Sequence, residues 1–405
     1  MNKLNIETPP SVSLDQGNLV KSLLVFVSDM TVGPIQTQFF HINETFFLDS
    51  GESFESLTLA YETYGTLNSD ASNAILVFHA LTGSQHAAGI NSEVPEAAPF
   101  WKEECVRGWW DAFIGPGKAF DTNRYFIICA NYIGGCYGST GPHSINPATG
   151  KPYGSQFPQV SGWDVVRAQL LLVDSLGIDC LHAAIGGSLG GMLSMLLATR
   201  RPHRVKKVIP IATGLQTTVL HRVHNFEQIL AIRNDSNFKG GDYYESEPPN
   251  EGLLLARIIS HKTFVSLDMM EKRAKQEIKF EQPIGKFYKL SNPIESYMFH
   301  QGNKFAARFD ANSYLRIMDM WQRFSLNAQQ PGLFKDCSHQ QYLIFSIDSD
   351  VCFYPEEQRV IVKALESAEM NVKHITVHSD KGHDSFLLEP DLYAPYIHFV
   401  LDEGS

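Results

Sequence analysis

One short stretch of the sequence constrains the fold more than any other. Residues 181–202 read LHAAIGGSLGGMLSMLLATRRP, so that Ser188 stands between two pairs of glycines. The apolar residues before the serine are typical of a buried strand, and those after it of a helix. Glycine is required where a backbone turns sharply or where side chains would clash. The stretch therefore predicts a strand, a tight turn that presents Ser188, and a helix ending near Arg200, because Pro202 disfavours helix at Arg201.

The rest of the chain repeats this alternation of strand and helix. Helical periodicity is clear at 162–177 and 356–371. Continuous apolar runs bounded by turn residues are typical of strands buried on both faces of a parallel sheet. Such runs lie at 74–80, 125–131, 181–187, 205–212, 342–348 and 372–379, and the segment 57–65 shows the alternation that is also typical of a strand. We therefore predict an α/β fold with a mostly parallel sheet and helices on both faces.

The alternation stops between about residues 215 and 335, where the sequence is polar and helix-rich without a convincing strand. We interpret 215–335 as a helical lid inserted into an α/β core made of 41–214 and 336–405. Residues 1–40 lack periodicity and are expected to form an N-terminal extension that is disordered in part.

Composition excludes several classes of function. The formal net charge of −11 argues against a nucleic-acid partner or an anionic membrane surface. The chain has no apolar run of about 18 residues, which a membrane helix needs, and no signal-peptide pattern, so we expect a cytoplasmic protein. Six scattered cysteines predict no disulfides, and the histidine spacing predicts no metal site.

Ser188 lies in a G-x-S-x-G motif, in which a serine on a strand-to-helix turn acts as a nucleophile. A serine hydroxyl needs a base to take its proton and an acid to orient that base, in the chain order serine, acid, histidine. Asp348 and Asp350 follow a predicted strand, and His383 follows the last one. Spacing alone does not decide which of the two aspartates is the acid that orients the histidine.

A developing negative charge on the substrate needs two backbone N–H groups. We expect them from Leu189, directly after the nucleophile, and from Leu81, in the loop after the strand at 74–80. The two leucines would then form the oxyanion hole of the predicted site.

From about residue 46 onward the sequence resembles the homoserine O-acetyltransferases. The glycine-rich segment 134–158 is the most specific part of this resemblance. Further matching segments lie at 61–68, 79–83, 108–131, 186–192, 240–244, 295–315 and 382–389. The resemblance implies an α/β-hydrolase fold with a helical lid, a homodimer interface formed partly by the lid, no bound cofactor, and acetyl-CoA as co-substrate.

The resemblance also implies residue roles. Ser188 becomes the acylated nucleophile, His383 the base, and Asp350 rather than Asp348 the acid, because in the family the dipeptide SD precedes an apolar residue, an aromatic residue and proline. Asp384 matches the aspartate that holds the substrate's ammonium. The implied reaction is ping-pong: acetyl-CoA acylates the serine, and the hydroxyl of homoserine then takes the acetyl group.

The lid departs from the family pattern. The arginine that holds the acceptor's carboxylate aligns with Ile229, so we predict that Arg233, one turn later, or Arg222, two turns earlier, replaces it. Residues 263–266 read TFVS where the family has a tyrosine and an arginine. Because a bidentate arginine is hard to replace, we expect an acceptor site that is rebuilt and more apolar.

Several alternatives therefore accompany homoserine acetylation. The acceptor could be serine or an alcohol without a carboxylate. The same triad would serve an esterase or thioesterase that uses water as the acceptor. A degenerate binding scaffold is disfavoured by the complete triad. Residues 79–86, HALTGSQH, favour an acetyl over a succinyl donor.

Overall fold

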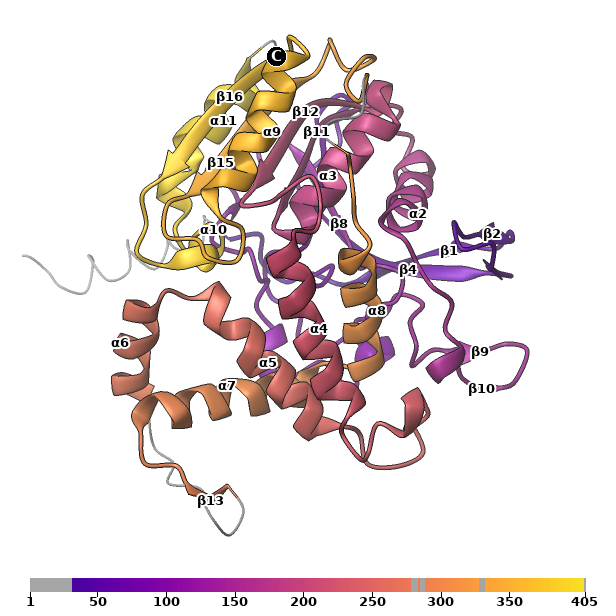
Figure 1. Cartoon of the computed structure of the whole chain (residues 1–405). Coiled ribbons are helices and arrows are strands. Elements are labelled where there is room, and N and C mark those ends of the chain that lie inside the picture. Colours follow the sequence, from indigo (N-terminus) through magenta and orange to yellow (C-terminus); the bar gives the residue numbers. More distant parts are fainter. Residues whose placement is uncertain (1–30, 278–282, 285–287, 328–331, 404–405) are drawn as a thin grey trace, which may run out of the picture.

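A computed structural model describes residues 31–277, 283–284, 288–327 and 332–403 of the 405-residue chain. Its centre is an eight-stranded sheet (Figure 1). In spatial order the strands are β1 (Gln38–Ile42), β4 (Leu57–Tyr64), β8 (Phe126–Ala130), β5 (Ala74–Phe78), β11 (Leu181–Gly187), β12 (Val205–Ile211), β15 (Gln341–Ile347) and β16 (Asn371–Val377). β8 to β16 run parallel, whereas β1 and β4 pair in antiparallel fashion at one edge. The predicted mostly parallel α/β fold is confirmed.

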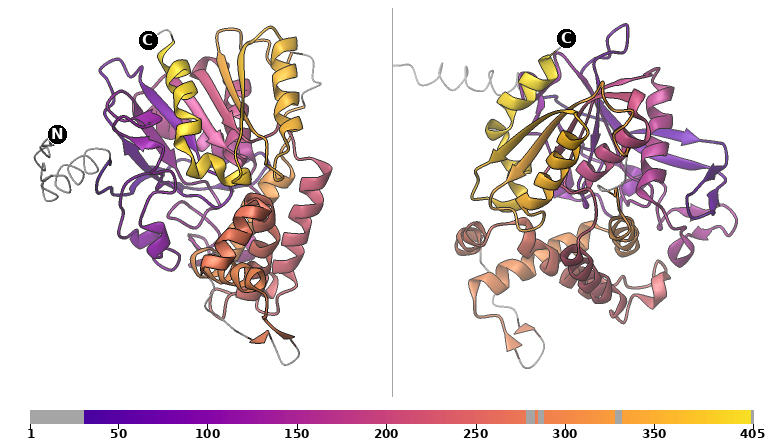
Figure 2. Two further views of the ribbon diagram at one scale, coloured as in Figure 1. Left: turned by 90° about the vertical axis from the view of Figure 1, so that its left-hand side faces the viewer. Right: turned by 45° about the horizontal axis from the view of Figure 1, so that its top comes forward.

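The central strands are buried on both faces, as their unbroken apolar runs indicated. In β5, Leu76 packs into one hydrophobic cluster, whereas Ile75 and Val77 pack into a second cluster on the other face. This division follows from the two-residue period of a strand. The two faces are covered by helices, shown on opposite sides of the sheet in Figure 2. They are α2 (Gly162–Ser175), α3 (Leu189–Arg200) and α9 (Pro355–Ser367) on one face and α11 (Ala394–Asp402) on the other.

The helical segment leaves the sheet after β12 and returns before β15, at the end of the sheet where the parallel strands terminate (Figures 1 and 2). Its helices are α4 (Val219–Arg233), α5 (Asn250–Phe264), α6 (Leu267–Glu277), α7 (Pro293–Arg308) and α8 (Ala311–Gln322). Its two ends lie together, because Gln216 bridges to Ser325 and the Leu326 N–H donates to the Leu215 carbonyl oxygen at 2.6 Å. We call α4 to α8 the lid.

Two details of the strands differ from the sequence-based expectations. β1 joins the sheet across the boundary drawn at residue 40, since its edge pairing with β4 leaves too short a pattern to recognise. Residues 1–30 of the proposed extension lie outside the described residues. The remaining strands are two-residue ladders: β2 (Phe46–Phe47), β3 (Ser53–Phe54), β6 (Ile114–Gly115), β7 (Phe120–Asp121), β9 (Ile145–Asn146), β10 (Lys151–Pro152) and, within the lid, β13 (Pro283–Ile284) and β14 (Tyr288–Lys289). None of the helices described has the length and apolar character that crossing a membrane requires.

Candidate active site

Ser188 occupies a strained backbone conformation between β11 and α3. Its φ is 58° and its ψ is −126°, in a region that side-chain-bearing residues rarely adopt. Two hydrogen bonds hold it there: its N–H donates to the Ile211 carbonyl oxygen at 2.9 Å, and its own carbonyl oxygen accepts from the Thr213 hydroxyl at 2.7 Å. The end of β12 and the residue Thr213 after it therefore fix the position of Ser188. The helix that follows, α3, ends at Arg200 as the sequence predicted.

The glycines around Ser188 are required by close approach. A Cβ at Gly186 would lie 2.2 Å from the carbonyl carbon of Gly190, and one at Gly190 would lie 2.1 Å from the Phe78 carbonyl oxygen. A Cβ at Gly187 would come within 2.4 Å of the Phe386 ring. These distances are far below van der Waals contact, so the turn exists only with glycine at these positions.

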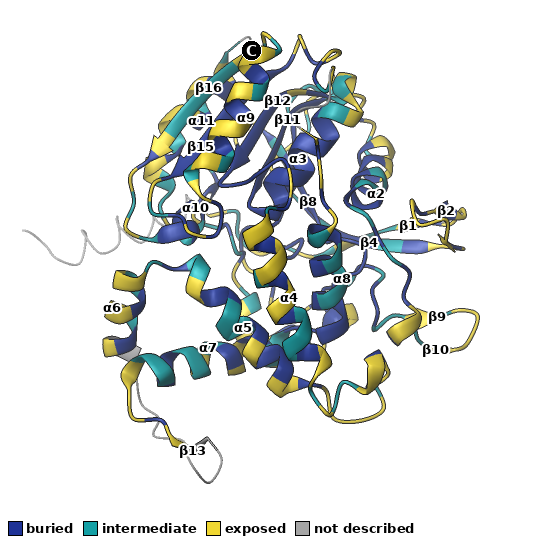
Figure 3. Cartoon of the chain, viewed as in Figure 1, coloured by how far each residue is buried: buried dark blue, intermediate teal, exposed yellow. Residues whose placement is uncertain are grey.

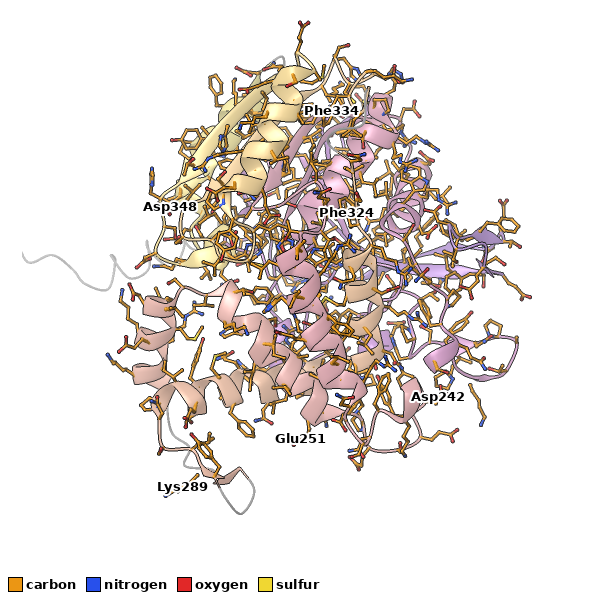
Figure 4. The ribbon with its side chains drawn as sticks, in the orientation of Figure 1. Asp242, Glu251, Lys289, Phe324, Phe334 and Asp348 are labelled. Carbon is orange, nitrogen blue, oxygen red and sulfur yellow. The ribbon has the colours of Figure 1, made fainter. Side chains whose placement is uncertain are left out.

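Asp350 and His383 are brought together from the ends of β15 and β16. The buried Asp350 Oδ2 lies 2.6 Å from His383 Nδ1. Asp350 Oδ1 accepts hydrogen bonds from the N–H groups of Cys352 and Phe353, at 2.7 and 2.9 Å. Asp348 (labelled in Figure 4) is instead exposed, with Oδ2 2.7 Å from Nδ1 of the surface residue His378. The structure thus distinguishes two acids that spacing could not.

His383 sits beside the turn that carries Ser188. Its ring packs edge-on against Phe386, which contacts Gly187, and is stacked on Phe353 at 5.6 Å. Burial lowers the pKa of His383, but the charge and hydrogen bond of Asp350, helped by Asp384, outweigh it and raise the pKa above its ordinary value. Within the described part of the chain, His383 Nε2 is buried without a hydrogen-bond partner. This atom is therefore free to accept a proton.

The backbone N–H groups of Leu81 and Leu189 are also available. Leu189 is the first residue of α3, whose N-terminal N–H groups have no partner within the helix and favour negative charge nearby. Leu81 belongs to a turn closed by a 3.0 Å hydrogen bond from the Gly83 N–H to the Ala80 carbonyl oxygen. Neither leucine N–H donates to an acceptor among the described residues. Both can therefore stabilise an oxyanion.

Next to His383 the structure places a pair of opposite charges that sequence reasoning found only in part. Asp384 is partly buried; burial raises its pKa, whereas the charges of His383, Arg257 and Arg273 act in the opposite direction. Arg257 enters from α5, and its guanidinium lies over the rings of Phe264 and Phe305, 5.4 and 5.1 Å from their centroids. Burial lowers the pKa of Arg257. No described carboxylate lies within ion-pair distance of it.

Arg257 was missed although the sequence carried a signal for it. The segment 253–259 reads LLLARII, a single cation within an otherwise apolar helical run. A buried cation in such a run usually has a ligand or a charge partner. The lone arginine of this run is therefore the sequence signal that pointed to Arg257 as a candidate site residue.

The predicted carboxylate-binding residues lie elsewhere. Arg233 is exposed at the C-terminal end of α4, about 18 Å along the helix axis from His221, which lies near the triad. Ile229 packs against the hydrophobic core, and Arg222 is exposed. Arg233 lies far from His383 because the helix runs away from the site, whereas Arg222, although it is in the first turn of α4, is exposed to solvent. Phe264, from the altered segment 263–266, does reach it, 6.0 Å from the His383 ring.

A cavity of about 250 Å³ opens beside the loop that carries Leu81. Thr82, Gly83 and Ser84 form one wall, and Arg257 reaches it from the lid. Three further cations line it, Arg107, Lys304 and Arg308, and Glu104 pairs with the last two at 3.1 and 2.8 Å. In the described residues, no group of three or more His, Cys, Asp or Glu side chains is arranged to hold a metal ion.

The fold and this arrangement are typical of one class of enzyme: an α/β protein with a serine at a strained strand-to-helix turn and an Asp-His pair at the ends of neighbouring strands. A model of the alpha/beta hydrolase fold family matches residues 73–390. A homoserine O-acetyltransferase from Methanohalobium evestigatum is 44% identical over 363 residues, which are 89% of this chain and 72% of that one. The chain belongs to the homoserine O-acetyltransferase family, and it is an O-acyltransferase.

Related proteins differ in the acyl group or the reaction that their names state. A homoserine O-succinyltransferase from Saccharophagus degradans is 41% identical, covering 89% of this chain and 94% of that one. The crystal structure of homoserine O-acetyltransferase from Bacillus anthracis matches with a TM-score of 0.80 at 29% identity, over 91% of this chain and 98% of that one. Esterase E22 matches with a TM-score of 0.79 at 26% identity, over 91% and 100%. The expected α/β-hydrolase fold and family are thereby confirmed.

Proposed function

We propose that this chain transfers an acetyl group from acetyl-CoA to the hydroxyl of L-homoserine through an acyl-Ser188 intermediate. The observation that carries the proposal is that two opposite charges, not ion-paired with each other, lie near His383. Asp384 follows His383 directly in the chain, and Arg257 stacks on Phe264, whose ring lies 6.0 Å from that of His383. An α-amino acid presents a carboxylate and an ammonium, which are the complements of this pair. A simple esterase substrate has no use for two opposite charges next to its base.

In the first half of the reaction, His383 Nε2 takes the proton of the Ser188 hydroxyl, and the serine oxygen attacks the thioester carbonyl carbon. The negative charge moves onto the carbonyl oxygen, where the N–H groups of Leu81 and Leu189 stabilise it. When the carbon–sulfur bond breaks, the imidazolium returns its proton to the departing thiolate, and free CoA leaves. Asp350 stabilises the imidazolium and keeps Nδ1 protonated throughout.

In the second half, the acceptor hydroxyl gives its proton to His383 Nε2 and attacks the ester carbonyl of acyl-Ser188. The bond to the serine oxygen breaks, and the imidazolium returns the proton to it, so the enzyme is restored and an O-acyl product is released. Arg257 would hold the acceptor's carboxylate and Asp384 its ammonium. These contacts place the hydroxyl at the base, which favours the bound alcohol over water.

We expect the phosphates of the acyl-CoA donor to bind at a wall of basic side chains. Arg107, Lys304 and Arg308 line the cavity beside the Leu81 loop, and their charge exceeds that of Glu104. Curated relatives carry both acetyl and succinyl names. Our choice of acetyl rests on the sequence of residues 79–86, and the assay below includes both donors.

Hydrolysis is the second candidate, because esterase E22 shares this fold over most of the chain. Water and an alcohol attack the same acyl-enzyme, so the triad itself cannot distinguish the two reactions. Release of CoA that is independent of any acceptor would favour this candidate.

We also propose that the enzyme is a homodimer that pairs through the lid. α4 exposes Val219, Val223 and Phe226, whose exposed fractions are 79%, 54% and 52%, at helical spacing (Figure 3). An apolar stripe of this kind is typical of a helix that packs against a partner. Sedimentation velocity of the wild type and of a Val223→Glu/Phe226→Glu variant tests this, and a wild-type monomer at micromolar concentration would exclude it.

The test of function is acceptor-dependent CoA release, followed by the colour of the free thiol. Acetyl-CoA and succinyl-CoA are each supplied with homoserine, serine, a carboxylate-free amino alcohol, or no acceptor, and Ser188→Ala serves as the control. Release from acetyl-CoA that depends on homoserine supports the proposal. Equal release without an acceptor would replace it with hydrolysis, and release that survives Ser188→Ala would remove the nucleophile.

A further inference from the structure

The base of the lid touches the loop that carries the catalytic acid. We call residues 350–353 the acid loop. Cys352 connects the two: its N–H donates to Asp350 Oδ1 at 2.7 Å, and its carbonyl oxygen lies 2.6 Å from Nε2 of His221, in the first turn of α4. One peptide segment thus joins a lid histidine to the carboxylate that orients His383.

The hydrogen bonds of His221 determine its tautomer. His221 Nδ1 accepts from the Thr218 N–H at 3.3 Å, as part of the capping box that begins α4. A ring nitrogen that accepts carries no proton, so the proton of the neutral ring is on Nε2 and is donated to the Cys352 carbonyl. Burial lowers the pKa of His221, which keeps the ring neutral.

Aromatic packing also connects the lid to the acid loop. The Phe353 ring lies 4.5 Å from His221 and is stacked on Trp321 at 5.6 Å, with an interplanar angle of 15°. The same ring is stacked on His383 at 5.6 Å and 22°. His221 is in the first lid helix and Trp321 in the last, so both ends of the lid press on the acid loop.

The acidic groups that face this joint are Asp350, Glu357 and Asp384, and the charge of Asp384 acts on both Cys352 and His383. Glu357, at the start of α9, has Oε1 3.6 Å from His221 Nε2. Burial, followed by the charge of Asp350, raises the pKa of Glu357 to about 8, so its carboxyl is mostly protonated at neutral pH. The charges of His383 and His224 also act on His221, in the direction that lowers its pKa. The carboxylate of Asp350 therefore remains available to His383.

We propose that His221 is a positioning residue that aligns Asp350 with His383 only while the base of the lid is seated on the acid loop. Because His221 and Trp321 both belong to the lid, activation of the nucleophile then depends on the contact between the lid and the acid loop. This inference rests on the proposed function, since it presumes that Ser188, His383 and Asp350 carry out acyl transfer.

The test measures acylation alone, by the pre-steady-state release of nitrophenol from p-nitrophenyl acetate, with no acceptor present. His221→Phe keeps a ring against Phe353 but removes the donor, whereas His221→Gln keeps an N–H that reaches the carbonyl. Losing one buried hydrogen bond should lower the acylation rate of His221→Phe about fivefold to tenfold, with the KM for the ester unchanged. His221→Gln should recover most of that rate.

The pH dependence separates positioning from a general loss of structure. If Asp350 loses its alignment, His383 loses part of the support that raises its pKa, so the acid limb of the rate profile should move to lower pH in His221→Phe. The matched control is His224→Phe, one turn along α4 and outside the acid loop, which should keep the wild-type rate and limb. If His221→Phe does not fold, His221→Asn gives the same comparison, because its amide is too short to reach Cys352.

A wild-type rate and acid limb in His221→Phe would overturn the inference, as would equal losses in His221→Phe and His224→Phe or a failure of glutamine to restore the rate. Failure of the proposed function looks different. In that case nitrophenol release would persist in Ser188→Ala, and the inference would fall with the triad.

Discussion

Asp350→Asn provides the sharpest test of the acid assignment. In the wild type, Asp350 Oδ1 accepts two backbone N–H groups and Oδ2 faces His383 Nδ1 at 2.6 Å. An asparagine must keep its amide oxygen at the Oδ1 position, because an NH2 group cannot accept those bonds. Its amide nitrogen then faces Nδ1, which must give up its proton, so the ring carries its proton on Nε2.

In the proposed mechanism this change removes the base, because Nε2 is the atom that accepts the proton of Ser188. The equivalent substitution in a Ser-His-Asp protease lowers kcat about 10⁴-fold. We expect a loss of about 10³- to 10⁴-fold in the acylation rate here, which corresponds to ~4 to 5.5 kcal/mol. Asp348→Asn is the matched control: its carboxylate pairs with exposed His378, so less than a twofold change is expected, or about 0.4 kcal/mol.

The assay is stopped-flow release of nitrophenol from p-nitrophenyl acetate by the wild type and both variants, with thermal unfolding measured in parallel. Equal losses in the two variants would leave the acid unassigned. An Asp350→Asn enzyme that is fully folded and within tenfold of the wild type would refute the tautomer argument altogether.

Three further predictions concern the acceptor site, the base and the turn. Arg257→Met should raise the KM for homoserine about 10- to 100-fold, as the loss of a charge-assisted hydrogen bond implies, and should leave the KM for a carboxylate-free amino alcohol nearly unchanged. Steady-state kinetics with both acceptors measure this, and equal increases for the two acceptors would contradict carboxylate binding. Because Asp350 raises the pKa of His383, we expect the acylation rate to fall as the pH is lowered, with a midpoint above about 6.5. A lower midpoint in the pH–rate profile would contradict the geometry of this pair. Gly186→Ala should lower the free energy of unfolding by about 3 kcal/mol or more, since the new Cβ would lie 2.2 Å from the Gly190 carbonyl carbon. Chemical denaturation measures this loss, and a value below about 1 kcal/mol would indicate that the turn can relax.

Local chemistry explains how much of the fold and site was predictable. The strands on both sides of Ser188 are continuous apolar runs because both faces of the sheet are covered, so their positions are visible in the sequence. The edge strand β1 was not predicted, because its five residues are mostly exposed or half-buried and form no continuous apolar run. The sequence indicated that the lid is helical, but it did not indicate in which direction each lid helix runs relative to the site.

The sequence by itself determined what depends on neighbouring residues and chain order: the glycine-flanked turn at Ser188, the end of its helix at Arg200, and an acid and a histidine after later strands. The tertiary structure alone decided which groups meet. Asp348 and Asp350 both follow β15, and two residues spaced by two would share one face of a continuing strand. The chain instead turns after Ile347, with the Asp350 N–H donating to the Ile347 carbonyl oxygen, so that Asp348 faces solvent and His378 while Asp350 faces His383. Likewise Arg257 rather than Arg233 faces the site, because the direction of a lid helix depends on how it packs, and that packing is set by residues far away in the sequence.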